Sequence, residues 1–326
     1  MSVKGTRRRL VTVIVLLFVT LTVFGQASYP RKAIDAICPW SAGGSTDIAF
    51  RGYMKYLAKE LGTDINVQNL TGGNGGIAWS KAAVSSKDGY TAILLTFDIL
   101  TNEAQKMTKV SYRDFDIVNM FTLQGMMLIT HSDFGYKDLE SFIAAAKKAK
   151  SEGKTLKIGI AGELGLWHQA GAIMAEKTGT EGAYTYVPFK GSGDQLADML
   201  GKHIDAMVTS LTASIQHVNE GTLTVLATMT DERVPAISKV PTFKELGYDV
   251  QYTSWRALAF PKGVPKNVLD TVRVAAKKAF YDPEFQAWAE KSNIDPFFLD
   301  HIASEEYMKN QYPMVEGIMK KFGLIK

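Results

Sequence analysis

The sequence predicts an α/β protein with two mainly parallel sheets, each flanked by helices, and a cleft between them. From residue 29 onward, short β-rich runs alternate with amphipathic helical stretches, the pattern of α/β units. Four strands lead into glycine-containing loops that each precede a helix, and these loops form two pairs about 90 residues apart. Such loops line a crevice at the carboxyl ends of parallel strands. We therefore expect two sheets that face a common ligand cleft.

The first unit illustrates the pattern. Residues 33–38 read as a strand, 39–46 as a loop and 47–61 as a helix with Phe50, Met54 and Leu57 on one face. Gly62 then supplies a helix stop. Further strands are expected at 65–69, 91–96, 126–130, 157–160, 184–187, 223–228 and 255–260, with a helix at 138–150 and three helical stretches at the end.

The first 27 residues have the features of a secretory signal peptide. Four basic residues precede an apolar run at 10–24, and Gly25 and Ala27 have the small-residue spacing of a cleavage site. The apolar run is shorter than the roughly 20 residues that a membrane span needs. We expect cleavage near Ala27 and a periplasmic or extracytoplasmic protein.

Composition excludes several functional classes. Without the four basic residues of 1–27, 37 Lys plus Arg fall to 33, equal to the 33 Asp plus Glu, so no excess of positive charge favours nucleic acid. Cys38 is the only cysteine and cannot form an intrachain disulfide. The five histidines have no zinc spacing, and no G-x-S-x-G elbow of a hydrolase is present. We expect no metal, no cofactor and no catalysis.

The loop 39–46 has the ingredients of an anion-binding site. Its glycines let backbone N–H groups approach a ligand, and Ser41, Ser45 and Thr46 supply hydroxyls beside a helix amino terminus. An ordinary capped turn explains the same residues about equally well. Glu163 and Lys190 are the only charged residues in the four loops, and charge-poor, donor-rich loops suit an anionic ligand.

The glycine run at 72–76 allows a competing interpretation. Gly73, Gly75 and Ala78 fit G-x-G-x-x-A, and Asp98 lies at a suitable distance for a ribose contact. The alternative function is a secreted dinucleotide-dependent oxidoreductase. A short glycine match is frequent, however, and an exported enzyme would lack a soluble cofactor pool.

Several motifs occur together in one order along the mature chain. They include Pro39-Trp40 through Asp47, the glycines of 72–76, Asp88-Gly89-Tyr90-Thr91, Phe189-Lys190-Gly191, and Pro241-Thr242 to Gly247. In this the chain resembles the substrate-binding proteins of tripartite tricarboxylate transporters, the Bug or TctC family. Two positions depart from that family's pattern: Ala42 replaces a proline, and the loop 161–168 is bulkier and carries Glu163.

The resemblance implies a periplasmic-binding-protein fold of type II-like architecture, with two domains joined by two crossing strands. It implies capture of a small carboxylate and delivery to a large and a small membrane subunit. We expect a monomer with residues 29–130 plus 253–326 in one domain and 131–252 in the other. The expected ligand contacts are Trp40, Ser41, Gly43, Gly44, Ser45, Thr46, Asp47, Gly73, Asn74, Thr96, Gly162, Glu163, Trp167, His168, Lys190 and Gly191.

Overall fold

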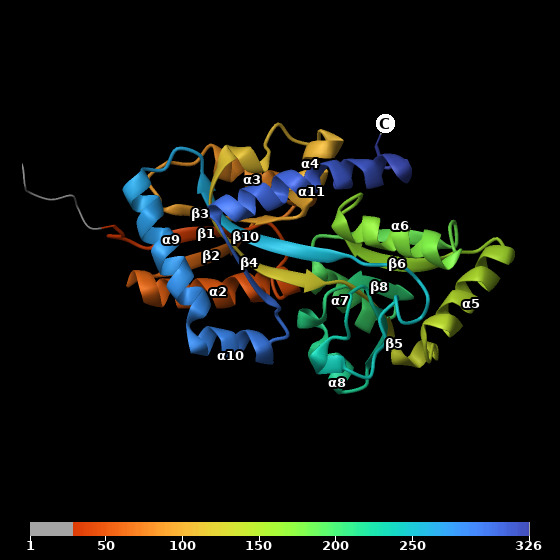
Figure 1. Ribbon diagram of the computed structural model, residues 1–326. Helices are drawn as coiled ribbons and strands as arrows, with labels where there is room; N and C mark the ends of the chain where they lie inside the picture. Colours follow the sequence, from red (N-terminus) through yellow and green to blue (C-terminus); the bar gives the residue numbers. More distant parts are fainter. Residues whose placement is uncertain (1–28, 326) are drawn as a thin grey trace, which may run out of the picture. The chain divides into compact units, whose positions relative to one another are not determined.

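The computed structural model describes residues 29–325, and from residue 32 onward the chain is organised around two β-sheets (Figure 1). The first sheet has six strands in the order β11-β4-β10-β3-β1-β2. Its strands are β1 (Ile34–Cys38), β2 (Ile65–Asn69), β3 (Thr91–Thr96), β4 (Phe115–Gly125), β10 (Thr253–Pro261) and β11 (Pro296–Asp300).

Two groups of helices complete this first lobe. Helices α2 (Ser45–Leu61), α9 (Lys266–Tyr281) and α10 (Pro283–Lys291) contact one another, while α11 (His301–Lys321) lies against α4 (Asp98–Gln105) and β4, and α3 (Gly76–Ala83) lies against β1 and β3 (Figure 1). Tyr53 of α2 joins this first group to the sheet, because its ring stacks on Phe121 of β4 at 4.5 Å and its hydroxyl donates to the Ala276 carbonyl of α9 at 2.8 Å.

The second lobe surrounds a five-stranded sheet in the order β7-β6-β8-β5-β9. Its elements are β5 (Met127–His131), α5 (Leu139–Ser151), β6 (Leu156–Ala161), α6 (Leu166–Thr178), β7 (Tyr184–Phe189), α7 (Ser192–Leu200), β8 (Ala206–Thr209), α8 (Ile215–Asn219) and β9 (Leu223–Thr228). Met127, Ile129, Met199 and Met207 contribute to its apolar core, which joins α7 to the sheet.

The chain passes between the two lobes at two adjacent points. Met126 separates β4 from β5, and residues 229–252 separate β9 from β10. Backbone hydrogen bonds join these passages, from Met229 to Met126 at 2.7 Å, from Tyr252 to Met229 at 2.9 Å and from Met126 to Tyr252 at 3.1 Å. Strand β5 belongs to the second sheet, whereas the expected domain boundary at residue 130 places most of this strand in the first domain. The domain boundaries stay a prediction.

The expectation of mainly parallel sheets was wrong, because both sheets are mixed. In the first sheet, β1 runs parallel to β2 and β3, whereas β10 is antiparallel to β3 and β4, and β11 is antiparallel to β4. In the second, β6 is parallel to β7 and β8, while β5 is antiparallel to β8 and β9. Every one of these antiparallel pairings involves β4, β5 or β10, the strands that adjoin the two crossings between the lobes.

The signal-peptide prediction concerns residues 1–27, which lie outside the described part of the chain. Among residues 29–325, no helix combines the length and the apolar character that a bilayer crossing requires.

Candidate functional site

Loops from both lobes meet around a small buried cavity at the ends of strands β1, β3, β6 and β7. The cavity measures about 10 Å³, which is about the size of one water molecule. Its walls include the first residues of three helices, α2, α6 and α7, whose amino termini carry partial positive charge. It is lined by Trp40, Gly44, Thr46, Thr96, Asp98, Ala161, Trp167, Gly191, Ser192 and Ser254. We call it the inner cavity.

A second cavity of about 330 Å³ lies beside the inner one, with the Trp40 side chain as a wall common to both. We call it the outer cavity. Asn74 of the first lobe donates to the Glu163 carbonyl of the second there, and Gln105 donates to the Leu164 carbonyl at 3.4 Å. The outer cavity is lined by Trp40, Gly72, Gly73, Asn74, Gln105, Met107, Gly162, Glu163, Leu164, Pro188, Phe189 and Lys190.

Most of the expected contact residues therefore come together, although their role in binding stays a prediction. Those at the inner cavity are Trp40, Gly44, Thr46, Thr96, Trp167 and Gly191, and those at the outer cavity are Trp40, Gly73, Asn74, Gly162, Glu163 and Lys190. Ser41, Gly43, Ser45, Asp47 and His168 line neither cavity.

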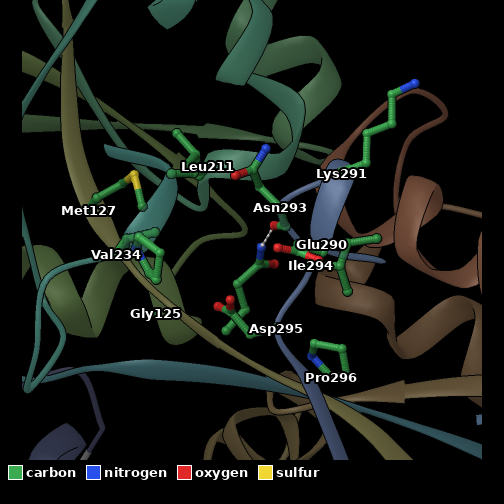
Figure 2. A pocket seen from close by; sticks show the side chains of 13 residues that line it. Gly125, Met127, Leu211, Val234, Glu290, Lys291, Asn293, Ile294, Asp295 and Pro296 are labelled. Carbon is green, nitrogen blue, oxygen red and sulfur yellow. Dashed lines mark hydrogen bonds between the residues drawn. The ribbon is translucent and has the colours of Figure 1, made fainter. Parts of the chain in front are cut away.

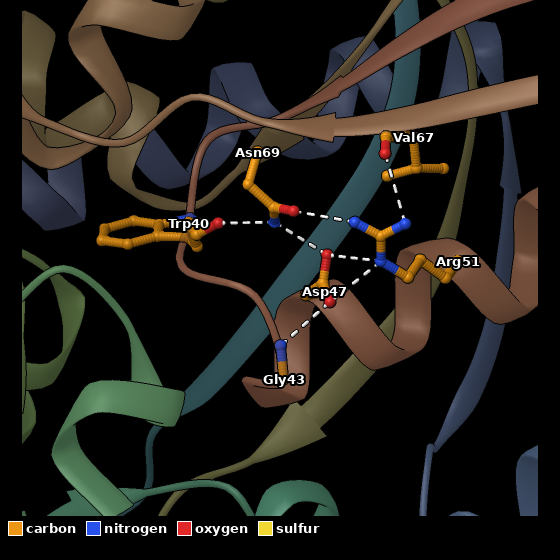
Figure 3. Close-up of polar contacts among 6 residues, drawn as sticks. All are labelled: Trp40, Gly43, Asp47, Arg51, Val67 and Asn69. Atoms are coloured by element: carbon orange, nitrogen blue, oxygen red, sulfur yellow. Dashed lines mark hydrogen bonds and ion pairs between the residues drawn. The ribbon is translucent and has the colours of Figure 1, made fainter. Parts of the chain in front are cut away.

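Asp47 holds the first loop in shape (Figure 3). Its carboxylate accepts the Gly43 N–H at 3.0 Å and the Asn69 amide at 2.8 Å, and it forms an ion pair with Arg51 at 2.9 Å. Asn69 also donates to the Trp40 carbonyl at 2.9 Å. These contacts occupy both carboxylate oxygens, so we expect Asp47 to position the loop rather than to contact a ligand.

Ser41 and Ser45 make contacts between the lobes. The Ser45 N–H donates to the Ser192 hydroxyl at 2.8 Å, and the Ser45 hydroxyl accepts the Ala213 N–H at 3.1 Å. The Ser41 N–H donates to the Lys190 carbonyl at 3.2 Å. In this closed arrangement, donors that the sequence suggested for a ligand hold the two lobes together.

Glycines make this close approach possible. A Cβ atom at Gly193 would lie 2.6 Å from the Ala42 carbonyl oxygen, and one at Gly191 would lie 2.8 Å from the Ser41 backbone nitrogen. Side chains at these two positions would keep the loops apart.

Trp167 and His168 begin helix α6 but have different surroundings. Trp167 is buried and lines the inner cavity. The His168 ring lies 4.4 Å from the Tyr186 ring, and its Nδ1 accepts the Leu164 N–H at 3.2 Å. Burial lowers the pKa of His168, which favours the neutral ring. His168 thus uses Nδ1 to accept a hydrogen bond from the backbone of the loop that precedes α6.

Sequence reasoning missed two buried charges at the cleft. Asp98, considered only as a ribose contact, is 2% exposed and lines the inner cavity, and Arg256 of β10 is fully buried behind it. Burial raises the pKa of Asp98 to about 6 and lowers that of Arg256 to about 10. The sequence did contain a signal for Arg256: it is a charged residue inside the apolar run at 255–260. Arginine is rarely buried unless it has a structural or functional partner.

The dinucleotide interpretation expects Asp98 to contact a ribose, and the structure gives this residue other partners. The Asp98 carboxylate accepts the Leu166 N–H of the second lobe at 2.9 Å and the Thr96 hydroxyl at 3.3 Å. Asp98 also lines the inner cavity, whereas Gly73 of the glycine motif lines the outer one, so the two features of that interpretation do not share one cavity.

A larger cavity, of about 550 Å³, lies beside the crossing strands and contains none of the expected contact residues (Figure 2). Its walls include Gln124, Leu211, Val234 and Asp295. Gln124 donates to the Asn293 carbonyl at 2.7 Å and to the Thr212 hydroxyl at 2.6 Å, and this links the lobes near the crossing. Size alone does not make it the ligand site, since the helix amino termini and glycine loops converge elsewhere.

Within residues 29–325, no group of three His, Cys, Asp or Glu side chains is arranged to hold a metal ion. Cys38 is buried, and burial raises its thiol pKa to about 12.

Comparison with known proteins decides the family. Residues 49–324 match the family described as "Tripartite tricarboxylate transporter family receptor". This chain belongs to that family. Among curated relatives, Protein BugT of Bordetella pertussis is 30% identical over 80% of this chain and 81% of its own length.

Solved structures agree on the fold. The periplasmic binding protein BugD has a TM-score of 0.84 at 25% identity, over 90% of this chain and 99% of its own. MatC from Rhodopseudomonas palustris, solved with malate, has a TM-score of 0.79 at 23% identity, over 89% of this chain and 99% of its own, and supports the fold alone. The family is one of solute-binding receptors, and this TctC-family chain has their two-lobed α/β fold.

Proposed function

We propose that this protein captures a small carboxylate between its lobes, catalyses no reaction, and delivers the ligand to the large and small membrane subunits of a tripartite transporter. The observation that carries the proposal is the convergence of three helix amino termini, of α2, α6 and α7, on one inner cavity. Helix amino termini present N–H donors and a partial positive charge, and both favour a carboxylate. Membership of a transporter-receptor family supports the same conclusion.

Binding requires the lobes to move. The inner cavity of about 10 Å³ accommodates about one water molecule, whereas a carboxylate ligand has several heavy atoms. The crossing at Met126 and at residues 229–252 provides two adjacent passages about which the lobes can rotate. Opening would separate the Ser45–Ser192 and Ser41–Lys190 hydrogen bonds and admit the ligand, and closure over the ligand would bring these two loops together again.

Malate, adipate, citrate, benzoate, aspartate and glutamate form a suitable first panel for thermal shift and calorimetry. A ligand at one hundred times its dissociation constant stabilises the native state by about 2.7 kcal/mol. At least one carboxylate should raise the melting temperature, and Trp40 and Trp167 should report closure by fluorescence because both line the inner cavity. A shift with sugars or cations and none with any carboxylate would exclude the anion site.

Delivery and export need separate tests. Proteoliposomes that contain both membrane subunits should take up the selected acid only when the binding protein is added outside. Intact-mass measurement of exported material should give a chain that starts at or near Ser28. Retention of residues 1–27 on a cytoplasmic protein would contradict the transport role.

A further inference from the structure

Two opposite charges are buried at the floor of the cleft without pairing with each other. Asp98 is 2% exposed and Arg256 is 0% exposed. Arg256 takes part in none of the ion pairs among residues 29–325, although Asp295 and Asp98 act on its charge from farther away. Burying a charge that has no ion-pair partner is costly, so these two separated charges at the cleft need an explanation.

Every hydrogen-bond partner of Arg256 is neutral. Its Nε donates to the Thr46 hydroxyl at 3.1 Å, and Nη1 donates to the Thr122 hydroxyl at 3.2 Å and to the Gln124 side-chain oxygen at 3.0 Å. Its buried Nη2 has no partner among the described residues. Because Thr46 lines the inner cavity, the guanidinium lies one hydrogen bond behind the cavity wall at the start of α2.

Asp98 places the negative charge on the cavity itself. One oxygen accepts the Leu166 N–H at 2.9 Å and the other accepts the Thr96 hydroxyl at 3.3 Å, both neutral donors. A carboxylate has about four acceptor positions, so capacity for a further donor remains. Asp98 is also the only ionisable side chain among the residues that line the inner cavity. Glu163 and Lys190 lie at the outer cavity, and both are exposed.

The strand register fixes the relation between the two charges. Arg256 of β10 pairs with Thr96 of β3, and Asp98 follows Thr96 by two residues. Arg256 also donates to the Thr46 hydroxyl in the first turn of α2, and Asp98 accepts the N–H of Leu166, the first residue of α6. The cavity accordingly has a positive wall and a negative wall.

We propose that the ligand is a zwitterion that carries both a carboxylate and an ammonium group, such as an α-amino acid. Its carboxylate binds at the start of α2, where Thr46 and the charge of Arg256 favour an anion, and its ammonium group donates to Asp98. This inference rests on the proposed capture of a carboxylate and narrows it. A ligand with carboxylates alone would bring a second negative charge next to Asp98, which is unfavourable in a buried site.

Matched pairs of acids that differ only in the amino group test the proposal. Calorimetry at pH 7.5 compares aspartate with succinate, glutamate with glutarate, and phenylalanine with 3-phenylpropionate. At least one pair should favour the amino member by tenfold or more. Comparable or tighter binding of the des-amino member in every pair that binds would overturn the inference and leave carboxylate capture intact. No binding by any of these acids would overturn it, and binding of malate, adipate, citrate or benzoate in the same assay would leave carboxylate capture intact.

Two variants assign the preference to Asp98. Asp98→Asn keeps the shape of the side chain and should reduce the preference for the amino member at least tenfold. The matched control is Asp116→Asn, because Asp116 is also buried and accepts the Gly263 and Val264 N–H groups away from the cavity. This control should lower stability and leave the ratio unchanged. An unchanged ratio of amino to des-amino affinity in Asp98→Asn would refute the role of Asp98. If that variant does not fold, the matched acids measured on the wild type still decide whether the ligand is a zwitterion.

Discussion

Replacing Gly193 by alanine should hold the lobes apart. A Cβ atom at this position would lie 2.6 Å from the Ala42 carbonyl oxygen and 3.2 Å from the Gly44 backbone nitrogen. Both are backbone atoms of the opposite lobe, which cannot rotate away as a side chain can. Gly193 lies in the first turn of α7 and has no left-handed backbone conformation, so alanine fits the isolated lobe without strain. The substitution therefore acts on closure and leaves the fold of each lobe unchanged.

The expected loss follows from the bonds that close approach permits. To restore ordinary contact near 3.4 Å, the loops must separate by several tenths of an ångström. That separation weakens the Ser45–Ser192 bond of 2.8 Å and the Ser41–Lys190 bond of 3.2 Å. Each is worth about 0.5–1.5 kcal/mol. A total of about 1–3 kcal/mol corresponds to a dissociation constant raised roughly 5- to 150-fold.

Calorimetry with the tightest-binding acid measures this loss, and small-angle scattering measures whether the ligand still makes the protein more compact. Gly317→Ala is the matched control, because Gly317 also lies in a helix and a Cβ atom there meets nothing within 4 Å. The control should bind as the wild type does. Affinity within twofold of the wild type in Gly193→Ala would refute the assumption that the lobes close over the ligand through these loop contacts.

Three further predictions follow from the site. The raised pKa of Asp98, about 6 against 3.8, contributes stability that is present below pH 3.8 and lost as pH rises through 6. Denaturant unfolding should therefore show wild type losing about 3 kcal/mol relative to Asp98→Asn between pH 3.8 and 7; a flat difference would contradict the burial of the charge. Asp47→Asn should speed hydrogen exchange in the loop before α2 and cost about 1–3 kcal/mol of stability, since the Gly43 and Arg51 contacts weaken; unchanged exchange would mean that the loop holds its shape alone. Gly44→Leu should lower affinity more than Lys190→Ala, because a Cβ atom at Gly44 would already lie 2.8 Å from the Ser192 hydroxyl whereas Lys190 is exposed; the reverse order in calorimetry would favour a charge-dominated site.

Local patterns sufficed for the units that form the cleft. Strands at 65–69, 91–96 and 223–228 have the predicted bounds, and helix α2 ends before Gly62, which adopts the left-handed conformation expected of a stop. These features depend on neighbours in the sequence: apolar runs, capping residues and glycine at helix ends. The loops that line both cavities follow from the same patterns, because strand ends and helix starts were recognisable.

The elements that escaped prediction depend on partners far away in the chain. Strand β4 contains the buried polar residues Asp116, Asn119, Thr122 and Gln124, which interrupt its apolar pattern. Asp116 binds the backbone at Gly263 and Val264, while Thr122 and Gln124 bind Arg256. No local rule identifies such residues as strand, because their burial is possible only when the distant partner is present.

By itself the sequence determined the α/β class, the succession of strands and helices, and the glycine loops. Only the tertiary structure decided the antiparallel pairing of β10 with β3 and β4, which brings Arg256 next to Thr46 and within one strand of Asp98. The reason is physical: strand pairing and the burial of charge are settled by contacts between residues up to 210 positions apart, and these contacts leave no periodic signal in the chain.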